Sequence, residues 1–110
     1  MQFMLLVCND DSFRPPPALE PEVINWVDEA KRRGMRISGS RFRPISEVKT
    51  IRVRGGERSL AGGPAVQAKE RITGYELVDC PSLEEAIELA SAHPMAAVGA
   101  VEIRQLWQVD

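Results

Sequence analysis

The stretch that decides the fold is Phe3-Met4-Leu5-Leu6-Val7-Cys8, an apolar run that ends at Asn9-Asp10-Asp11. Its length and its polar end are typical of a β-strand that runs into a loop. Successive side chains of a strand point to opposite faces of the sheet, so this strand is apolar on both of its faces. A strand of that kind needs cover on both sides.

Two later segments have the spacing of amphipathic helices. Residues 20–33 predict one helix, with Pro21 in the first turn and Gly34 as the stop. Ser82 followed by Glu85 predicts a capping box at the start of a second helix, which Pro94 ends. The two apolar stripes consist of Val23, Trp26, Val27 and Ala30 in the first helix, and Leu83, Ala86, Ile87 and Ala90 in the second.

The remaining pattern predicts strands. Residues 35–42 read as a strand interrupted at Gly39, and residues 50–54 alternate strictly between polar and apolar side chains. Gly55-Gly56 predicts a tight hairpin turn into residues 57–60. Further strands are expected at 73–79 and 100–109, whereas 65–71 is ambiguous and fits a single helical turn.

The element order is therefore β-α-β, a hairpin, then β-α-β, within one domain over residues 1–110. This order predicts an α+β fold of the ferredoxin-like split βαβ type with an inserted β-hairpin, in which the helices cover one face of an antiparallel sheet. No third long helix is expected for the other face. A second subunit packed sheet against sheet would cover it, which predicts a homodimer. The alternative is that the hairpin or residues 65–71 fold over that face.

The composition limits the classes of partner and the cellular compartment that we expect. The 110 residues are 44% hydrophobic and 27% charged, as in an ordinary globular protein, and the net charge of −2 argues against nucleic acid as the main partner. The basic run from Lys31 to Arg43 is interpreted as a solvated helix end. Cys8 and Cys80 lack a CxxC spacing, and the apolar start is too short for a signal peptide or a membrane span. We therefore expect a cytoplasmic protein without a membrane partner.

Few residues suggest chemistry. His93 is the only histidine, and it is either a general acid/base or a partly positive imidazole that complements the dipole at a helix end. We expect no metal site, because the His, Cys and Asp residues lack ligand spacing. We expect no cofactor, because neither Gly55-Gly56 nor Gly62-Gly63 forms a dinucleotide or phosphate loop.

The strands carry a charged set that deserves a hypothesis. Arg52, Arg54, Glu102 and Arg104 point to the face opposite their apolar neighbours, so in a dimer they would face the space between the sheets. They could bind a small acidic metabolite there, or they could be structural ion pairs in which Glu102 pairs with Arg52 or Arg104. Lys69 and Glu70, on the loop beside the sheet, are open to the same two interpretations.

Several motifs, taken in order, resemble the DGPF-domain branch of the YCII-related family. They are Thr50-Ile51-Arg52-Val53-Arg54-Gly55-Gly56, Gly62-Gly63-Pro64, Lys69-Glu70, Gly74-Tyr75, Leu83-Glu84-Glu85-Ala86, His93-Pro94 and Gly99-Ala100-Val101-Glu102-Ile103-Arg104. The resemblance implies a dimeric α/β barrel built from ferredoxin-like protomers.

The chain departs from the family where the signature Asp-Gly-Pro-Phe is replaced by Gly62-Gly63-Pro64-Ala65. Related proteins are proposed to use a His–Asp pair, and this chain has no histidine on its first helix. The favoured hypothesis is a dimeric module that binds a small acidic ligand or has an accessory role, since DGPF-type domains are associated with some sigma factors. The alternative is a cofactor-free isomerase- or lyase-like enzyme that acts in the dimer cavity.

Overall fold

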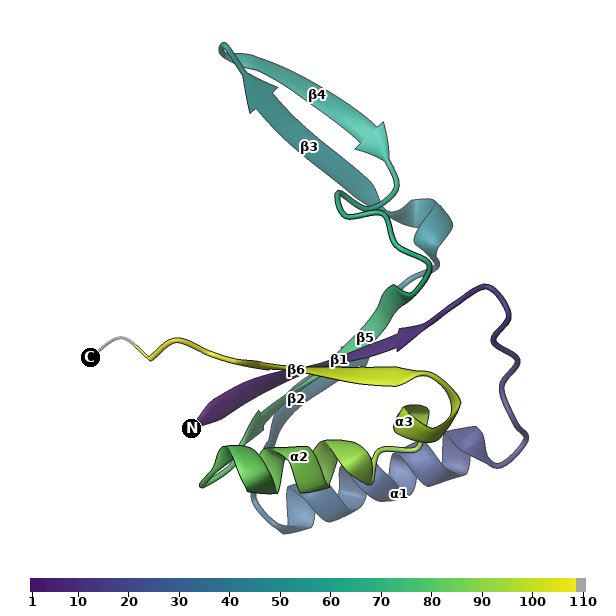
Figure 1. Ribbon diagram of the computed structural model, residues 1–110, viewed down its shortest axis with the longest axis vertical. Coiled ribbons are helices and arrows are strands. Elements are labelled where there is room, and N and C mark those ends of the chain that lie inside the picture. The colour runs from purple at the N-terminus through teal and green to yellow at the C-terminus, as the bar shows by residue number, and fades with distance from the viewer. Residues whose placement is uncertain (109–110) are drawn as a thin grey trace.

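The computed structural model describes residues 1–108, which form a two-layer body and a projecting hairpin (Figure 1). The body consists of β1 (Gln2–Asn9), α1 (Leu19–Arg32), β2 (Arg36–Arg41), β5 (Arg71–Asp79), α2 (Leu83–Ser91), the short α3 (Met95–Val98) and β6 (Ala100–Gln105). Between β2 and β5 lie a 3-10 turn, η1 (Ile45–Glu47), and the hairpin of β3 (Lys49–Arg54) and β4 (Glu57–Gly62).

The four strands of the body form one antiparallel sheet in the order β2-β5-β1-β6. This is the ferredoxin-like arrangement, and the predicted α+β class and split βαβ order are confirmed. The apolar strand β1 is central, between β5 and β6. Strand β6 ends at Gln105, earlier than predicted; residues 106–108 are not strand, and residue 109 lies outside the described range.

Both helices lie on one face of the sheet, as predicted (Figure 1). Alternate residues of β1 point to them: Phe3 and Leu5 are fully buried, and Val78 of β5, the register partner of Phe3, is buried beside them. The helices complete this core with Trp26, Ala30, Ala86, Leu89 and Ala90. Burial of these apolar side chains is the main term that holds the two layers together.

The helix ends follow the predicted signals with one exception. Gly34, just after α1, has a φ of 70°, a conformation that glycine adopts without strain. Ser82 Oγ accepts a hydrogen bond from the backbone N–H of Glu85 at 3.2 Å, as in a capping box. The Glu85 carboxylate does not complete the box, because its buried Oε2 has no hydrogen-bond partner within residues 1–108.

The hairpin does not cover the sheet. It forms a two-stranded sheet of its own that stands away from the body on the side opposite the helices, and nearly all its residues are exposed (Figure 1). Residues 65–70 form bends, so the helical turn suggested by the sequence is absent. Neither alternative cover proposed for the second face is present.

The second face of the sheet is therefore open in the described chain. We call it the open face; it carries the other alternate residues of β1 with their partners on β5 and β6, namely Met4, Leu6, Tyr75, Leu77, Glu102 and Arg104. The two edge strands of the sheet, β2 and β6, are both irregular or charged. The register of β2 with β5 shifts between Arg36 and Ser38. Strand β6 carries the charged residues Glu102 and Arg104. No segment among residues 1–108 covers the apolar centre of the open face (Figure 1).

Candidate functional site

The charged residues chosen from the sequence do not gather at one place in the chain. Arg52 and Arg54 lie on the exposed hairpin, which is separate from the main sheet. Glu102 and Arg104 lie on the open face, where Arg104 Nε donates to Glu102 Oε2 at 2.7 Å. Of the two pairs considered for Glu102, the structure forms the one with Arg104.

Lys69 and Glu70 lie in the exposed bends that lead into β5. Glu70 lines a shallow pocket of about 310 Å³ together with Asp10, Ser12 and Phe13. Burial, with smaller effects from Glu102 and Glu70, raises the pKa of the Cys8 thiol. Cys8 is therefore a poor nucleophile at neutral pH.

His93 lies in the helix layer and not near the open face. Its side chain is buried, it contacts Trp26 edge to face at 4.7 Å between ring centroids, and its Nδ1 accepts a hydrogen bond from the backbone N–H of Met95. Burial lowers the pKa of His93 to about 4. The imidazole is therefore neutral at pH 7, and the interpretation as a partly positive group at a helix end is wrong, because burial disfavours the charge.

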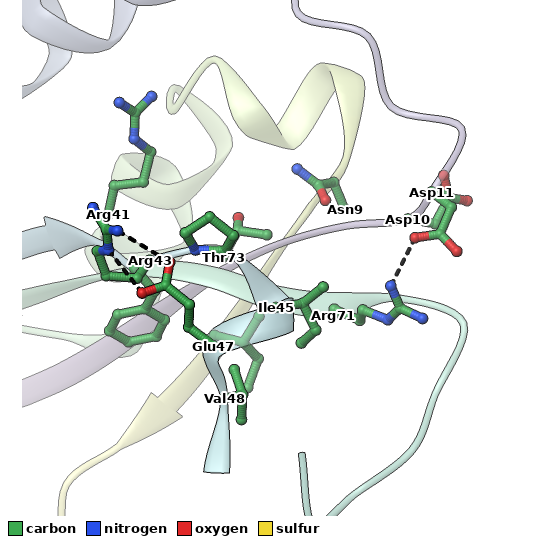
Figure 2. Close-up of a pocket in the computed structure, with 13 residues that line it drawn as sticks. Asn9, Asp10, Asp11, Arg41, Arg43, Ile45, Glu47, Val48, Arg71 and Thr73 are labelled. Carbon is green, nitrogen blue, oxygen red and sulfur yellow. Dashed lines mark hydrogen bonds and ion pairs between the residues drawn. The ribbon is translucent and has the colours of Figure 1, made fainter. Parts of the chain in front are cut away.

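A more concentrated site lies at the end of the sheet where β1 and β2 end and β5 begins. A pocket of about 360 Å³ opens there (Figure 2). Chain segments far apart in the sequence supply its walls: Asn9, Asp10 and Asp11 at the end of β1, residues 41–45 with Glu47 and Val48 at the end of β2, and Arg71, Ile72 and Thr73 of β5.

Three arginines line this pocket, and they differ in whether they form an ion pair. Arg71 Nη1 pairs with Asp11 Oδ1 at 2.7 Å, and Arg43 Nη2 pairs with Glu47 Oε2 at 3.1 Å (Figure 2). Arg41 forms no ion pair with any side chain of residues 1–108. Its side chain extends from the pocket wall toward the helix layer (Figure 2).

The other side chains that line the pocket include apolar ones and a carboxylate that already accepts hydrogen bonds. Phe42 stacks on Tyr75 of the open face with ring centroids 5.8 Å apart, and Ile45 and Ile72 expose a third to a half of their surface. Hydrogen bonds from the Ser12 hydroxyl and backbone N–H lower the pKa of Asp10, so this carboxylate stays charged. The pocket thus combines an apolar surface with one unpaired cation.

The sequence did not identify this pocket. The basic run that includes Arg41 and Arg43 predicts a solvated helix end, whereas the fold separates them from Lys31 and places them at a strand end. The usable signal was that polar residues follow β1 and β2 and precede β5, and these three points meet at the same end of an antiparallel sheet.

Other classes of site are not found in the described part of the chain. Among residues 1–108, no three His, Cys, Asp or Glu side chains come close enough to hold a metal ion. None of the helices between residues 1 and 108 combines the length and the apolar character that crossing a membrane requires.

A family model for the YCII-related domain matches residues 1–110, which is the whole chain. The chain belongs to the YCII-related family. An uncharacterised protein of Rhizobium meliloti (strain 1021), R00369, is 35% identical over 71 residues. That match covers 61% of this chain and 56% of the relative, so it spans about half of the relative's length.

A solved structure also aligns with this YCII-related chain along nearly its full length. It is 5-chloro-2-hydroxyhydroquinone dehydrochlorinase from Burkholderia phenoliruptrix AC1100, in complex with 2,5-dihydroxybenzoquinone. The alignment covers 98% of this chain and 94% of that chain, with a TM-score of 0.47 and 13% sequence identity. The reaction of that enzyme does not transfer to this chain at such a distance.

Proposed function

We propose that this YCII-related chain is a homodimeric ligand-binding module, and that it takes a small carboxylate with an apolar body into the pocket at the end of the sheet. The single observation that carries this proposal is Arg41, an arginine at a pocket wall with no ion-pair partner among residues 1–108. A guanidinium binds a carboxylate through two parallel hydrogen bonds, which fixes the orientation of the ligand. Phe42, Ile45 and Ile72 would contact its apolar body.

The dimer in this proposal rests on the open face. Met4 and Leu6 of β1, with Tyr75 and Leu77 of β5, form an apolar centre that no other segment of residues 1–108 covers. A second copy packed on this face would bury it, and the surrounding pair of Glu102 and Arg104 would lie at the rim. This is the sheet-against-sheet assembly that the resemblance to the family implies.

A thermal-shift screen with small aliphatic and aromatic carboxylates tests the ligand class, because a ligand that prefers the folded state raises the Tm. We expect at least one carboxylate to raise the Tm of the wild type. Loss of a charge-assisted hydrogen bond should weaken its binding roughly 10- to 100-fold in Arg41→Gln. Arg58→Gln, which removes an exposed arginine of the hairpin, is the matched control and should bind like the wild type.

Two results would contradict the proposal: no carboxylate raises the Tm, or Arg41→Gln binds as tightly as the wild type. The alternative, a cofactor-free isomerase or lyase, stays a prediction. Asp10 would be the base at this pocket, and its lowered pKa makes it a weak one.

A further inference from the structure

The hairpin of β3 and β4 is amphipathic, yet its apolar face is left exposed by residues 1–108. Ile51, Val53 and Leu60 share one of its faces, because Ile51 is the register partner of Leu60 and Val53 lies two residues further along. These side chains are 61%, 57% and 60% exposed. A two-stranded hairpin is marginally stable in water unless its apolar face is covered.

The position of the hairpin limits what can cover it. It projects on the side of the sheet opposite the helices, so it stands beside the space above the open face (Figure 1). Strands of six residues extend about 20 Å, whereas packed sheets lie about 10 Å apart. A hairpin of this length could therefore reach the sheet of a second copy seated on the open face.

A second uncovered apolar group lies at the opposite end of the sheet. Trp107, just beyond β6, is 91% exposed, the highest fraction among the large apolar side chains. The register of β6 with β1 places this tail at the end where β1 starts, whereas the hairpin follows the end of β2 at the other end. A two-fold axis that inverts strand direction brings each tail next to the hairpin of the other copy.

Charge supports the same arrangement. The hairpin carries Lys49, Arg52, Arg54 and Arg58 against the single acid Glu57, in a chain whose net charge is −2. The end of the sheet near Trp107 carries charges of both signs: Asp79 at the end of β5 pairs with the Met1 ammonium at 3.1 Å, α1 ends there with Lys31 and Arg32, and α2 carries Glu84 and Glu88. Glu84 and Glu88 form no ion pair among residues 1–108, so these two acids are the groups that the basic hairpin of another copy could attract.

The apolar area of the open face gives a further reason to expect the hairpin at the interface. A stable interface buries about 800 Å² on each partner. Met4, Leu6, Tyr75 and Leu77 are already half-buried by their neighbours, so the open face offers little apolar area by itself. The three hairpin side chains and Trp107, a residue type that buries about 150–250 Å², add the apolar surface that the face lacks.

We propose that the β3–β4 hairpin is a dimerisation arm that clasps a second copy of this chain, with the partner's Trp107 packed on Ile51, Val53 and Leu60. The two arms act reciprocally, so each dimer contains two such contacts. This inference rests on the homodimer of the proposed function, and it is independent of the ligand.

Sedimentation equilibrium of the full chain tests the arm. We expect a wild-type dimer, and a dimer weakened roughly 30-fold or more by Leu60→Asp and by Trp107→Ala, as for buried anchors of an interface. Val66→Asp is the matched control, because Val66 is 81% exposed but lies outside the hairpin; it should leave the dimer unchanged. Leu6→Arg, on the open face, should abolish the dimer.

The outcomes separate the two proposals. A dimer that is lost in Leu6→Arg but unchanged in Leu60→Asp and Trp107→Ala overturns the arm alone, and a wild-type monomer overturns both. A second measurement keeps Leu60 and Trp107 in place and mixes Arg58→Cys chains with Gln108→Cys chains, each carrying Cys8→Ser, under mild oxidation; Arg58 is the register partner of Val53, and Gln108 adjoins Trp107. We expect a disulfide only in the mixture; its absence would also overturn the arm.

Discussion

The Nε of Arg36 donates a hydrogen bond to Oε2 of Glu76 at 2.7 Å, and this ion pair lies within the helix-facing layer of the sheet. The side chains are only 15% and 9% exposed. Burial raises the pKa of Glu76, and the bond from Arg36 offsets part of that rise. The pair needs room on the neighbouring strand, where Gly39 is the register partner of Glu76.

Gly39→Ala should lower the free energy of unfolding by about 1–3 kcal/mol, because overpacking a filled site forces its neighbours to move. A β-carbon on Gly39 would overlap the Glu76 carboxylate and approach the Arg36 guanidinium to 2.6 Å. Urea denaturation measures the change. In a Glu76→Ala background the same substitution should cost little, and an equal cost in both backgrounds would contradict this explanation.

His93 should make the protein less stable in acid. Its pKa is about 4 in the folded chain and 6.5 as the ordinary value, so the unfolded chain binds the proton more readily between these limits. The stabilisation is complete above pH 6.5 and is lost as the pH falls through 4, up to about 3 kcal/mol.

Comparison of urea denaturation for the wild type and His93→Asn at pH 7 and pH 4.5 isolates this contribution. Glu76 acts in the opposite direction, because its raised pKa favours the folded chain at lower pH, and it is common to both proteins. A parallel loss of stability in both proteins would show that His93 is not the source.

Ser82→Ala should cost about 1 kcal/mol of stability, because it removes the acceptor for an otherwise unpaired N–H at the start of α2. Ser91→Ala is the control at the other end of the helix. Ser91 Oγ bonds back to the carbonyl of Ile87, a contact that does not stabilise helices. Thermal unfolding of the two variants should separate them clearly; equal Tm values would count against the cap.

The two faces of β1 should respond differently to truncation. Leu5→Ala removes a fully buried side chain of the core and should cost about 2–5 kcal/mol at every protein concentration. Leu6→Ala acts on the open face, so its cost should shrink on dilution if a second copy covers that face. Chemical denaturation over a 100-fold range of concentration distinguishes the two, and a concentration-independent cost for Leu6→Ala would weaken the case for the dimer.

The sequence predicted those parts of the fold that depend on local pattern. The apolar run of residues 3–8, the stripe around Trp26 and the Ser82 cap are patterns within a few residues, so the elements and their order could be read directly. The position of Arg41 could not be read from the sequence in this way, because it depends on how β2 pairs with β5. The shift of register between Arg36 and Ser38 has no signature in the residues themselves.

The candidate site was harder to predict from the sequence than the fold was. Arg52 and Arg104 share the same strand alternation, but pattern does not reveal that their strands belong to different sheets. The sequence left two interpretations of His93 open, a general acid/base and a partly positive imidazole at a helix end, and neither predicted its burial. Its burial against Trp26 is a tertiary contact across 67 positions of sequence, which only the packing of α1 on α2 creates.

The irregular border strands of the sheet also govern how molecules can aggregate. A straight, apolar border would let copies add end on end by backbone hydrogen bonding into a growing ribbon. Here the bulge near Arg36 bends one border, and Glu102 with Arg104 would place charge against any strand added at the other. Concentrated solutions should therefore stay free of fibrils, with self-association limited to closed assemblies.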